Sequence, residues 1–373
     1  PKAVQITHLT VLFAGLTLIE RFDVTAADVC YLSMPLFHSN ALLAGWSVAV
    51  GSGAAMVPAT FSASGLLPDL RRYGATFMNY VGKPLAYVLA TPEQRDDHHN
   101  PLRVAFGNEA SDRDIAEFSR RFDCTVWDGF GSTEGAIIIT RDDGCPPGSL
   151  GRGFPGVAIY HPDTLTECPP ARFDDDGAVT NPEEAIGELV NTSGAGLFAG
   201  YYNDPDATGA RLRQGMYWSG DLAYRDQDGW IYFAGRSGDW LRVDGENMTT
   251  APIERILQRM PAISQVAVYA VADEQVGDQV MAALVLTDNA ELTPAEFGGF
   301  LGGQPDLSPK AWPRYVWITD RLPTTATNKI LKRELRARGA APAAGVLWTR
   351  GRGTTYAVAD RSGECAPAAP RLS

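Results

Sequence analysis

The chain has 373 residues, 45% hydrophobic and 20% charged, an ordinary globular composition that excludes a disordered or fibrous protein and suggests two or three domains. Its formal net charge of −12 argues against a surface for nucleic acid or anionic membrane, because such surfaces need clustered lysine and arginine. The five cysteines form no CxxC pair, which favours a reducing compartment over a disulfide framework.

The first third of the chain alternates short β-branched and aromatic runs with amphipathic segments, a pattern typical of an α/β layer with parallel strands. We expect helices at residues 40–50, 62–73 and 112–122, and strands at residues 55–57, 76–80 and 125–127. Residues 29–68 contain no Asp, Glu, Lys or Arg. Proline, glycine and serine interrupt this stretch, so it lacks the run of about 18 apolar residues that a membrane span needs. We expect it to form buried core.

The pattern changes after residue 143. Residues 144–176 are rich in Gly, Pro and Asp, which predicts loops and hairpins. A compact α+β unit is expected after Arg236, with one helix opening at Pro252 and another at a Thr-Pro-Ala-Glu capping box that starts at Thr293. After residue 143 we expect strands at residues 188–190, 230–234, 240–243, 265–271, 280–287, 314–319, 346–348 and 354–358.

The most specific motif lies in residues 216–254. It sets Asp221, after a Ser-Gly turn, ahead of Arg236, and a glycine-bearing loop and a helix start follow. This order resembles the adenylate-forming enzymes, which include acyl-CoA synthetases, adenylation domains of peptide synthetases and luciferases. The resemblance implies that Asp221 holds the ribose hydroxyls of ATP, that Arg236 also reaches the ribose, and that a hinge between domains follows Arg236.

A second motif, DGFGSTEG at residues 128–135, follows a predicted strand. Taken alone it fits a glycine-rich turn as well as a ligand site. Beside the first motif it resembles the family's adenine and phosphate loop. The resemblance implies that Phe130, between Gly129 and Gly131, stacks on adenine, and that Asp128 accepts a hydrogen bond from the adenine amino group. It assigns the other face of adenine to Gly107, Asn108 and Glu109.

The same resemblance assigns the phosphates and the metal. Thr133 donates to the α-phosphate, and Glu134 holds Mg²⁺, a hard cation that takes carboxylate and phosphate oxygens. Lys329 lies in PTTATNK, which resembles the family's PxTxxGK motif with asparagine in place of glycine. The family's lysine meets the carboxylate and α-phosphate oxygens while acyl-adenylate forms, where a positioned ammonium stabilises the charge on phosphorus.

His38 ends the sequence Pro-Leu-Phe-His. A lone histidine in an apolar segment is more often a core residue than a catalyst. This sequence, however, resembles the family's motif on the substrate side, where an aromatic residue separates the carboxylate pocket from the coenzyme A tunnel. We therefore interpret His38 as a gate or substrate-orienting residue.

The hinge region, GRSGD at residues 235–239, is similar to the fatty-acid transport protein branch of long-chain acyl-CoA synthetases. The implied fold is a large, partial N-terminal AMP-binding domain (parallel sheets with helices plus a β subdomain) at residues 1–236, a small mobile α+β domain at 237–340 and a tail at 341–373. In the family the loop at Gly245 lines the coenzyme A tunnel. The opening Pro-Lys resembles the end of the family's phosphate loop, so we expect the preceding segment to be missing and residues 1–373 alone to be inactive with ATP.

The leading hypothesis is a fatty acid–CoA ligase in lipid metabolism that uses ATP, Mg²⁺ and coenzyme A. One alternative is an acyl-AMP ligase that passes the acyl group to a carrier protein. Another is a non-catalytic protein that binds lipid or nucleotide. A cytoplasmic location is expected, and peripheral membrane contact, oligomeric state and acyl chain length stay open.

Overall fold

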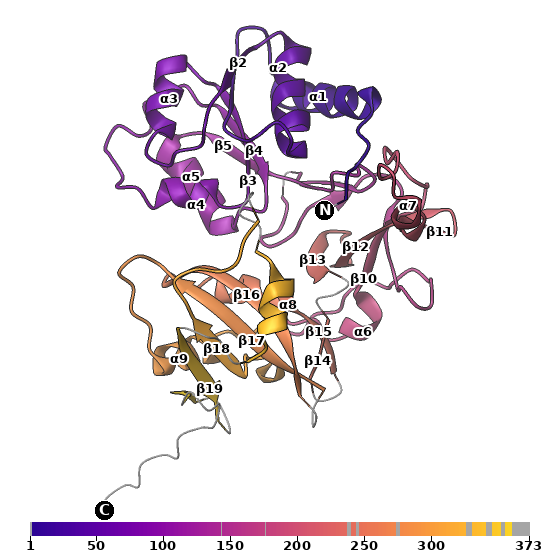
Figure 1. Cartoon of the computed structure of the whole chain (residues 1–373), viewed down its shortest axis with the longest axis vertical. Helices are drawn as coiled ribbons and strands as arrows, with labels where there is room; N and C mark the ends of the chain where they lie inside the picture. The colour runs from indigo at the N-terminus through magenta and orange to yellow at the C-terminus, as the bar shows by residue number, and fades with distance from the viewer. Residues whose placement is uncertain are drawn as a thin grey trace, which may run out of the picture. The chain divides into compact units, whose positions relative to one another are not determined.

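The computed structural model describes residues 2–142, 144–175, 177–236, 240–243, 246–273, 277–325, 330–340, 345–351 and 355–359. The chain divides into two compact units, residues 1–158 with 189–219 and residues 159–188 with 220–373. Each has its own hydrophobic core, and the helices and strands of both can be followed in Figure 1. The predicted boundary and hinge after Arg236 stay a prediction.

The first unit is built on a parallel five-stranded sheet in the order β2-β1-β3-β4-β5. Its strands are β1 Val29–Leu32, β2 Ala55–Pro58, β3 Phe77–Val81, β4 Val104–Asn108 and β5 Thr125–Asp128. Its helices are α1 His8–Phe22, α2 Ser47–Ser52, α3 Leu66–Tyr73, α4 Pro84–Leu89 and α5 Asp112–Phe122. The predicted alternation of strands and helices around a parallel sheet is confirmed.

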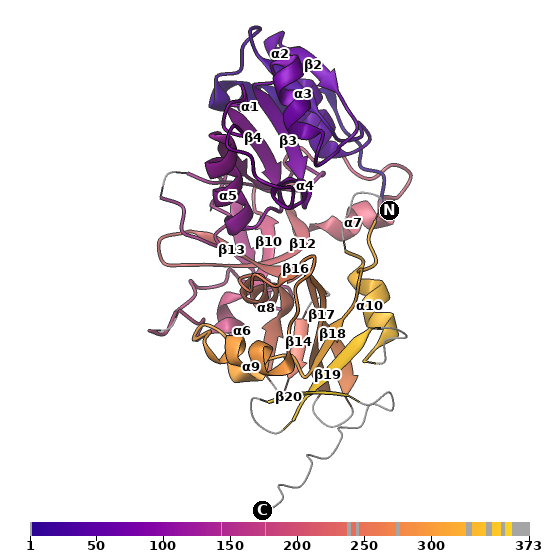
Figure 2. The ribbon, with the colours of Figure 1, turned by 90° about the vertical axis from the view of Figure 1, so that its left-hand side faces the viewer.

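Helices cover both faces of this sheet (Figure 2). Successive strand residues point to opposite faces, so Tyr31 packs with the core beneath α3, α4 and α5, while its neighbours Cys30 and Leu32 pack with the core beneath α1 and α2. The uncharged stretch contributes buried residues such as Val48 and Leu66, but its Phe37 and Val50 are 80% and 59% exposed, so only part of it forms the expected core. No helix in the described part of the chain is long and apolar enough to cross a membrane.

Several helix boundaries differ from the expectation. The helix expected at residues 40–50 opens as a π-helix, Ala41–Trp46, and continues as α2. The position of Gly45 in this wider turn needs glycine, because a Cβ there would lie 2.8 Å from the Leu32 side chain. The second helix begins at residue 66 and not at 62, since the Ser62 hydroxyl instead caps a turn by accepting the Gly65 N–H. Helix α1 was not expected; its Leu9 and Leu12 side chains are 64% and 59% exposed.

Beyond the parallel sheet, short antiparallel strands follow. A three-stranded sheet contains β6 Phe130–Gly131, β7 Ile138–Thr140 and β8 Arg152–Gly153. The next sheet contains β9 Val157–Tyr160, β10 Gly187–Asn191, β11 Leu212–Arg213, β12 Met216–Arg225 and β13 Ile231–Arg236, with helices α6 Pro182–Ala185 and α7 Pro205–Arg211 in its connections. The division into units passes through strands β9, β10 and β12.

The second unit has a seven-stranded sheet. Its strands are β14 Trp240–Val243, β15 Glu246–Thr249, β16 Ile263–Asp273, β17 Gly277–Leu286, β18 Tyr315–Ile318, β19 Val346–Arg350 and β20 Tyr356–Val358. Its helices are α8 Thr250–Leu257, α9 Pro294–Gly302, the 3₁₀-helix η2 Pro309–Ala311 and α10 Lys332–Arg338. Alternate residues of β16 face opposite cores, one beneath α8 and α9 and one beneath α10. The capping box at Thr293 and Glu296 is confirmed.

Candidate functional site

The segment DGFGSTEG begins at the carboxyl end of β5, an edge of a parallel sheet where ligands commonly bind. The chain turns at Gly129, whose N–H donates to the Gly107 carbonyl of β4 at 2.8 Å. It then forms β6, which contains Phe130, and turns again at Gly135, whose φ of 68° lies in the region that favours glycine. The two sets of predicted adenine residues, at 107–109 and 128–131, therefore lie at the ends of the neighbouring strands β4 and β5.

Asp128 is fixed by the protein itself. Its Oδ2 accepts hydrogen bonds from the Ala110 N–H at 2.9 Å and the Tyr80 hydroxyl at 3.0 Å. Burial raises the pKa of Asp128 to about 6, in opposition to these hydrogen bonds. Tyr80 reaches it only because Gly107 has no side chain: a Cβ there would lie 2.5 Å from the Tyr80 ring. Gly107 thus has a packing role besides the predicted adenine contact, and an adenine contact by Asp128 stays a prediction.

The two carboxylate oxygens of Glu134 differ in their hydrogen bonding within the described residues. Its Oε1 accepts a hydrogen bond from the Tyr201 hydroxyl at 2.7 Å, and within the described residues Oε2 has no hydrogen-bond partner. Thr133 shares a hydrogen bond of 2.9 Å between its hydroxyl and that of Ser39. A carboxylate oxygen is the donor that Mg²⁺ takes and a hydroxyl can donate to a phosphate, so these two consecutive residues fit the predicted metal and nucleotide.

Three asparagines that the sequence reasoning did not connect form a chain of amides. Asn79 Nδ2 donates to Asn40 Oδ1 at 2.6 Å, and Asn40 Nδ2 donates to Asn108 Oδ1 at 3.0 Å. Asn108 Nδ2 in turn donates to the Gly129 carbonyl. Since Asn79 and Asn40 are buried, this chain holds the turn at Gly129 against the sheet. Asn108, predicted as a ligand residue, is therefore also part of the scaffold.

The neighbours of these asparagines include two more predicted residues. His38 Nδ1 accepts the Asn40 N–H at 3.2 Å, so the histidine ring is oriented beside the amide chain, and its predicted gating role is untested. Glu109, directly after β4, has a φ of 67°, which is uncommon for a residue other than glycine. Uncommon backbone conformations of this kind often occur at functional sites.

The predicted ribose residues pair within the second unit. Asp221 on β12 lies opposite Arg236 on β13, and Arg236 Nε lies 3.2 Å from Asp221 Oδ1. The Asp221 side chain is 9% exposed and the Arg236 side chain 60% exposed. Next to Asp221, the Gly220 N–H donates to Glu188 Oε1 at 2.6 Å. The spacing of the two motif residues in the sequence thus becomes one cross-strand pair. Lys329 and Gly245 lie outside the described residues.

Comparisons with known proteins give consistent matches. The AMP-binding enzyme family model matches residues 1–202, and the AMP-binding enzyme C-terminal domain model matches residues 252–329. The medium/long-chain-fatty-acid–CoA ligase FadD17 of Mycobacterium marinum is 55% identical over 340 residues, which are 91% of this chain and 65% of that protein. The steroid-22-oyl-CoA synthetase of Rhodococcus jostii is 53% identical over 83% of this chain and 56% of its own length.

A solved structure shows the same fold. ATP-bound MatB from Rhodopseudomonas palustris superposes with a TM-score of 0.76 at 24% sequence identity, over 90% of this chain and 65% of that one. The chain therefore spans about two thirds or less of the length of these relatives.

Proposed function

Because the chain belongs to the AMP-binding enzyme family, we propose that it takes part in ATP-dependent ligation of a carboxylic acid to coenzyme A, through an acyl-adenylate. The substrate class proposed is a fatty acid or a similarly apolar acid. Two relatives above 50% identity are named as CoA ligases, one for medium and long-chain fatty acids and one for a steroid acid, which supports coenzyme A as the acceptor.

The observation that carries the proposal is the arrangement around Glu134. Glu134, whose Oε2 has no hydrogen-bond partner in the described ranges, directly follows Thr133 in the glycine-rich turn after β5. In the proposed reaction Mg²⁺ supplies positive charge to the phosphates. Glu134 binds the metal, Thr133 donates to the α-phosphate, and the amide chain through Asn108 keeps the turn in position for adenine, which Phe130 contacts. Asp221 and Arg236 hold the ribose hydroxyls.

Lys329 acts in the first half-reaction and a hinge after Arg236 permits the second. The two family matches leave residues 203–251 between them, a gap that includes the proposed hinge. We expect Gly238→Pro in the complete gene product to slow thioester formation from supplied acyl-AMP while adenylate formation continues, because proline restricts backbone rotation. Equal slowing of both half-reactions would place the hinge elsewhere.

The test of the activity is product analysis with the complete gene product. Purified protein with ATP, Mg²⁺, a series of fatty acids and coenzyme A should release pyrophosphate and AMP and form acyl-CoA, detected by mass spectrometry. Transfer to an acyl carrier protein in place of coenzyme A would favour the alternative ligase. Nucleotide binding without acid-dependent pyrophosphate release would favour a non-catalytic protein. A cytoplasmic location is proposed with this activity, since ATP and coenzyme A are its substrates.

A further inference from the structure

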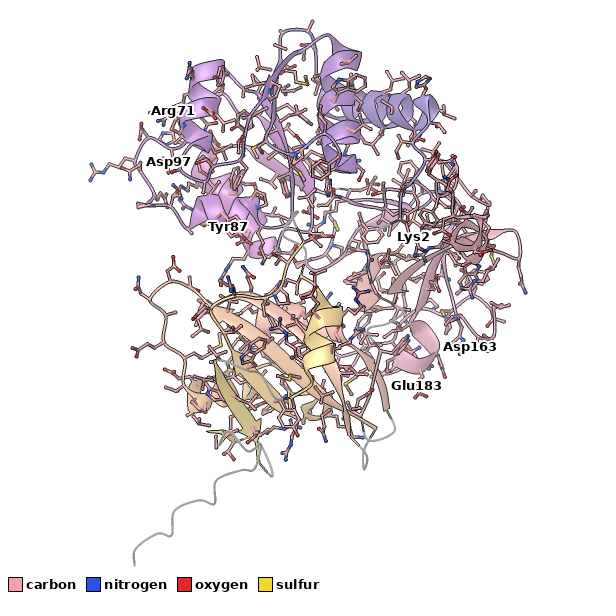
Figure 3. The ribbon with its side chains drawn as sticks, in the orientation of Figure 1. Lys2, Arg71, Tyr87, Asp97, Asp163 and Glu183 are labelled. Carbon is pink, nitrogen blue, oxygen red and sulfur yellow. The ribbon has the colours of Figure 1, made fainter. Side chains whose placement is uncertain are left out.

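Two cationic side chains lie against Tyr201, the residue whose hydroxyl donates to Glu134. Tyr201 donates to Glu134 Oε1, and Arg211, the last residue of α7, directs its Nε to the same tyrosine oxygen at 3.4 Å. Lys2 places its ammonium nitrogen 4.8 Å from the centre of the Tyr201 ring (Lys2 is labelled in Figure 3). Residues distant in sequence, 2, 134, 201 and 211, therefore meet within the first unit.

Arg211 is held loosely by the protein. Its second contact, from Nη1 to the Trp218 carbonyl, measures 3.3 Å, and both contacts are longer than the usual 2.9–3.0 Å of an N–H···O bond. Its Nη2 has no hydrogen-bond partner within the part of the chain that the structure describes. The half-buried Arg211 guanidinium therefore has N–H groups that can donate hydrogen bonds to a ligand, and Glu134, which contacts the same tyrosine, has an oxygen that can bind a cation.

The charges favour an anion. The chain as a whole carries −12, so a polyphosphate needs a local positive site. Lys2 and Arg211 supply two positive charges against one negative charge on Glu134. The Tyr201 hydroxyl donates to Glu134 Oε1 at 2.7 Å, which occupies that oxygen of the carboxylate. Within the described residues Glu134 Oε2 is thus available to a cation and Arg211 Nη2 to an anion.

We infer that Arg211 binds the terminal phosphates of ATP and remains with pyrophosphate as it leaves, assisted by Lys2. The inference rests on the proposed function. In that reaction a carboxylate oxygen of the acid forms a bond to the α-phosphorus, and the bond from that phosphorus to the bridging oxygen breaks. The electron pair leaves on pyrophosphate, whose negative charge the Arg211 guanidinium stabilises through the planar, paired donors that suit phosphate.

The experiment compares ligands that differ only in these phosphates. Wild type, Arg211→Met and Arg211→Lys forms of the complete gene product are titrated by calorimetry with AMP, ATP and inorganic pyrophosphate, with Mg²⁺ and with EDTA. For Arg211→Met we expect affinity for ATP and pyrophosphate to fall roughly ten- to hundredfold, with AMP affinity within about twofold. Arg211→Lys should lose less. Retained AMP binding shows that the variant is folded.

Control variants test whether Arg211 contacts the phosphates directly. Arg120→Met removes an equal charge from an exposed arginine paired with Glu93 and Glu117, and it should change no affinity. Tyr201→Phe should weaken ATP only in the presence of Mg²⁺, because it affects Glu134. Equal losses for AMP and ATP, no loss for ATP, or a loss in Arg211→Met that disappears in EDTA would each overturn direct binding by Arg211. Absence of nucleotide binding in the wild type would instead refute the proposed function.

Discussion

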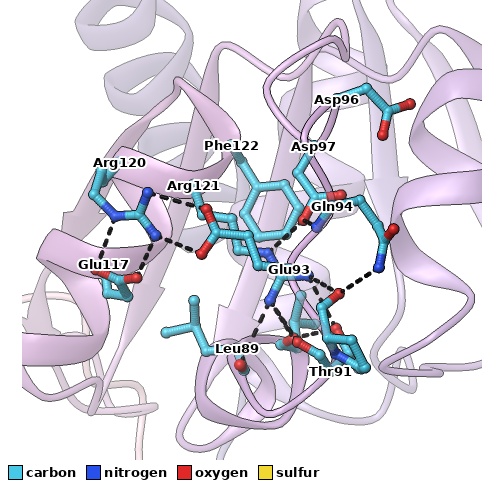
Figure 4. Close-up of polar contacts among 12 residues, drawn as sticks. Leu89, Thr91, Glu93, Gln94, Asp96, Asp97, Glu117, Arg120, Arg121 and Phe122 are labelled. Atoms are coloured by element: carbon cyan, nitrogen blue, oxygen red, sulfur yellow. Dashed lines mark hydrogen bonds and ion pairs between the residues drawn. The ribbon is translucent and has the colours of Figure 1, made fainter.

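Two ionic clusters of the first unit differ in how fully the protein uses them. In one, Arg121 is buried against Asp97, with Nε 2.6 Å from the carboxylate, and all three guanidinium nitrogens have partners (Figure 4). Four of those partners are backbone carbonyls, two at the end of α4 and two in the segment that follows it. In the other, around Tyr201, Glu134 and Arg211 each keep an atom with no partner in the described ranges. The first arrangement ties a loop to a helix, whereas the second has capacity for a ligand.

Asp97→Ala should have the largest effect, on stability alone. It would leave the buried Arg121 charge without its carboxylate, and breaking such a pair typically costs about 3–5 kcal/mol. Chemical denaturation should show this loss, while nucleotide affinity of the folded variant stays unchanged. The matched control is Asp96→Ala, whose ion pair with Arg71 is exposed and contributes about 1 kcal/mol or less. Similar losses in both variants would contradict the distinction.

Lys329→Ala tests the chemistry rather than the stability. Loss of a donor that meets charge in the transition state should slow acyl-adenylate formation roughly 10²–10³-fold. Thioester formation from supplied acyl-AMP should largely remain, because the proposed lysine acts only in the first half-reaction. Stopped-flow measurement of both half-reactions checks this, with Lys310→Ala as the exposed lysine control. A loss shared equally by both steps would remove Lys329 from its proposed role.

Asp221→Ala tests a ribose contact, in contrast to the contact with the terminal phosphates that is proposed for Arg211. A ribose contact is present in AMP and ATP, so both affinities should fall together by about 1.5–3 kcal/mol, the contribution of a hydrogen bond to a charged group. Calorimetry with both nucleotides gives the two losses. Glu183→Ala, a change of an exposed acidic residue on α6, serves as the charge control. Unchanged AMP affinity in the Asp221 variant would show that another residue holds the ribose.

The smallest effect concerns pH and has opposite signs at two aspartates of the first unit, Asp97, which is buried, and Asp128, which is half-buried. Burial raises the pKa of Asp128 from 3.8 to about 6, so its contribution to stability is present below about pH 4 and lost as pH rises through 6. Burial acts to raise the pKa of Asp97, but the hydrogen bond from the Gln94 N–H and the Arg121 guanidinium outweigh it and lower that pKa. The contribution of Asp97 to folding stability is therefore present above the pKa of the unfolded state and is lost as the pH falls through the pKa of the folded state.

Unfolding free energies of Asp128→Asn and Asp97→Asn, measured between pH 3 and 7 against wild type, test these signs. Relative to wild type, Asp128→Asn should gain stability as pH rises from 4 to 7, because only the wild type must ionise this half-buried carboxyl group. Asp97→Asn should be most destabilised near neutral pH and less so in acid. Parallel pH profiles for the two variants would contradict the opposed environments of the carboxyl groups.

The sequence by itself determined the fold class and the order of the motifs. Hydrophobic alternation involves only neighbouring residues, so the parallel sheet and the strand at residues 240–243 were predictable. The capping box at Thr293 was predictable for a similar reason, because its hydrogen bonds join residues three positions apart. The motif residues Asp128, Glu134, Asp221 and Arg236 were found through resemblance. Their roles toward ATP remain predictions, as do those of Lys329, Gly245 and His38.

Only the tertiary structure decided which side chains form hydrogen bonds with one another. The amide chain joins Asn40, Asn79 and Asn108, and Glu134 meets Tyr201 across 67 positions of the sequence. No local periodicity encodes such pairs, because they depend on strand order and on the absence of side chains at glycines such as Gly107, past which Tyr80 reaches Asp128. A motif therefore identifies the chemistry a residue can perform, while long-range packing determines which of its atoms are left to perform it.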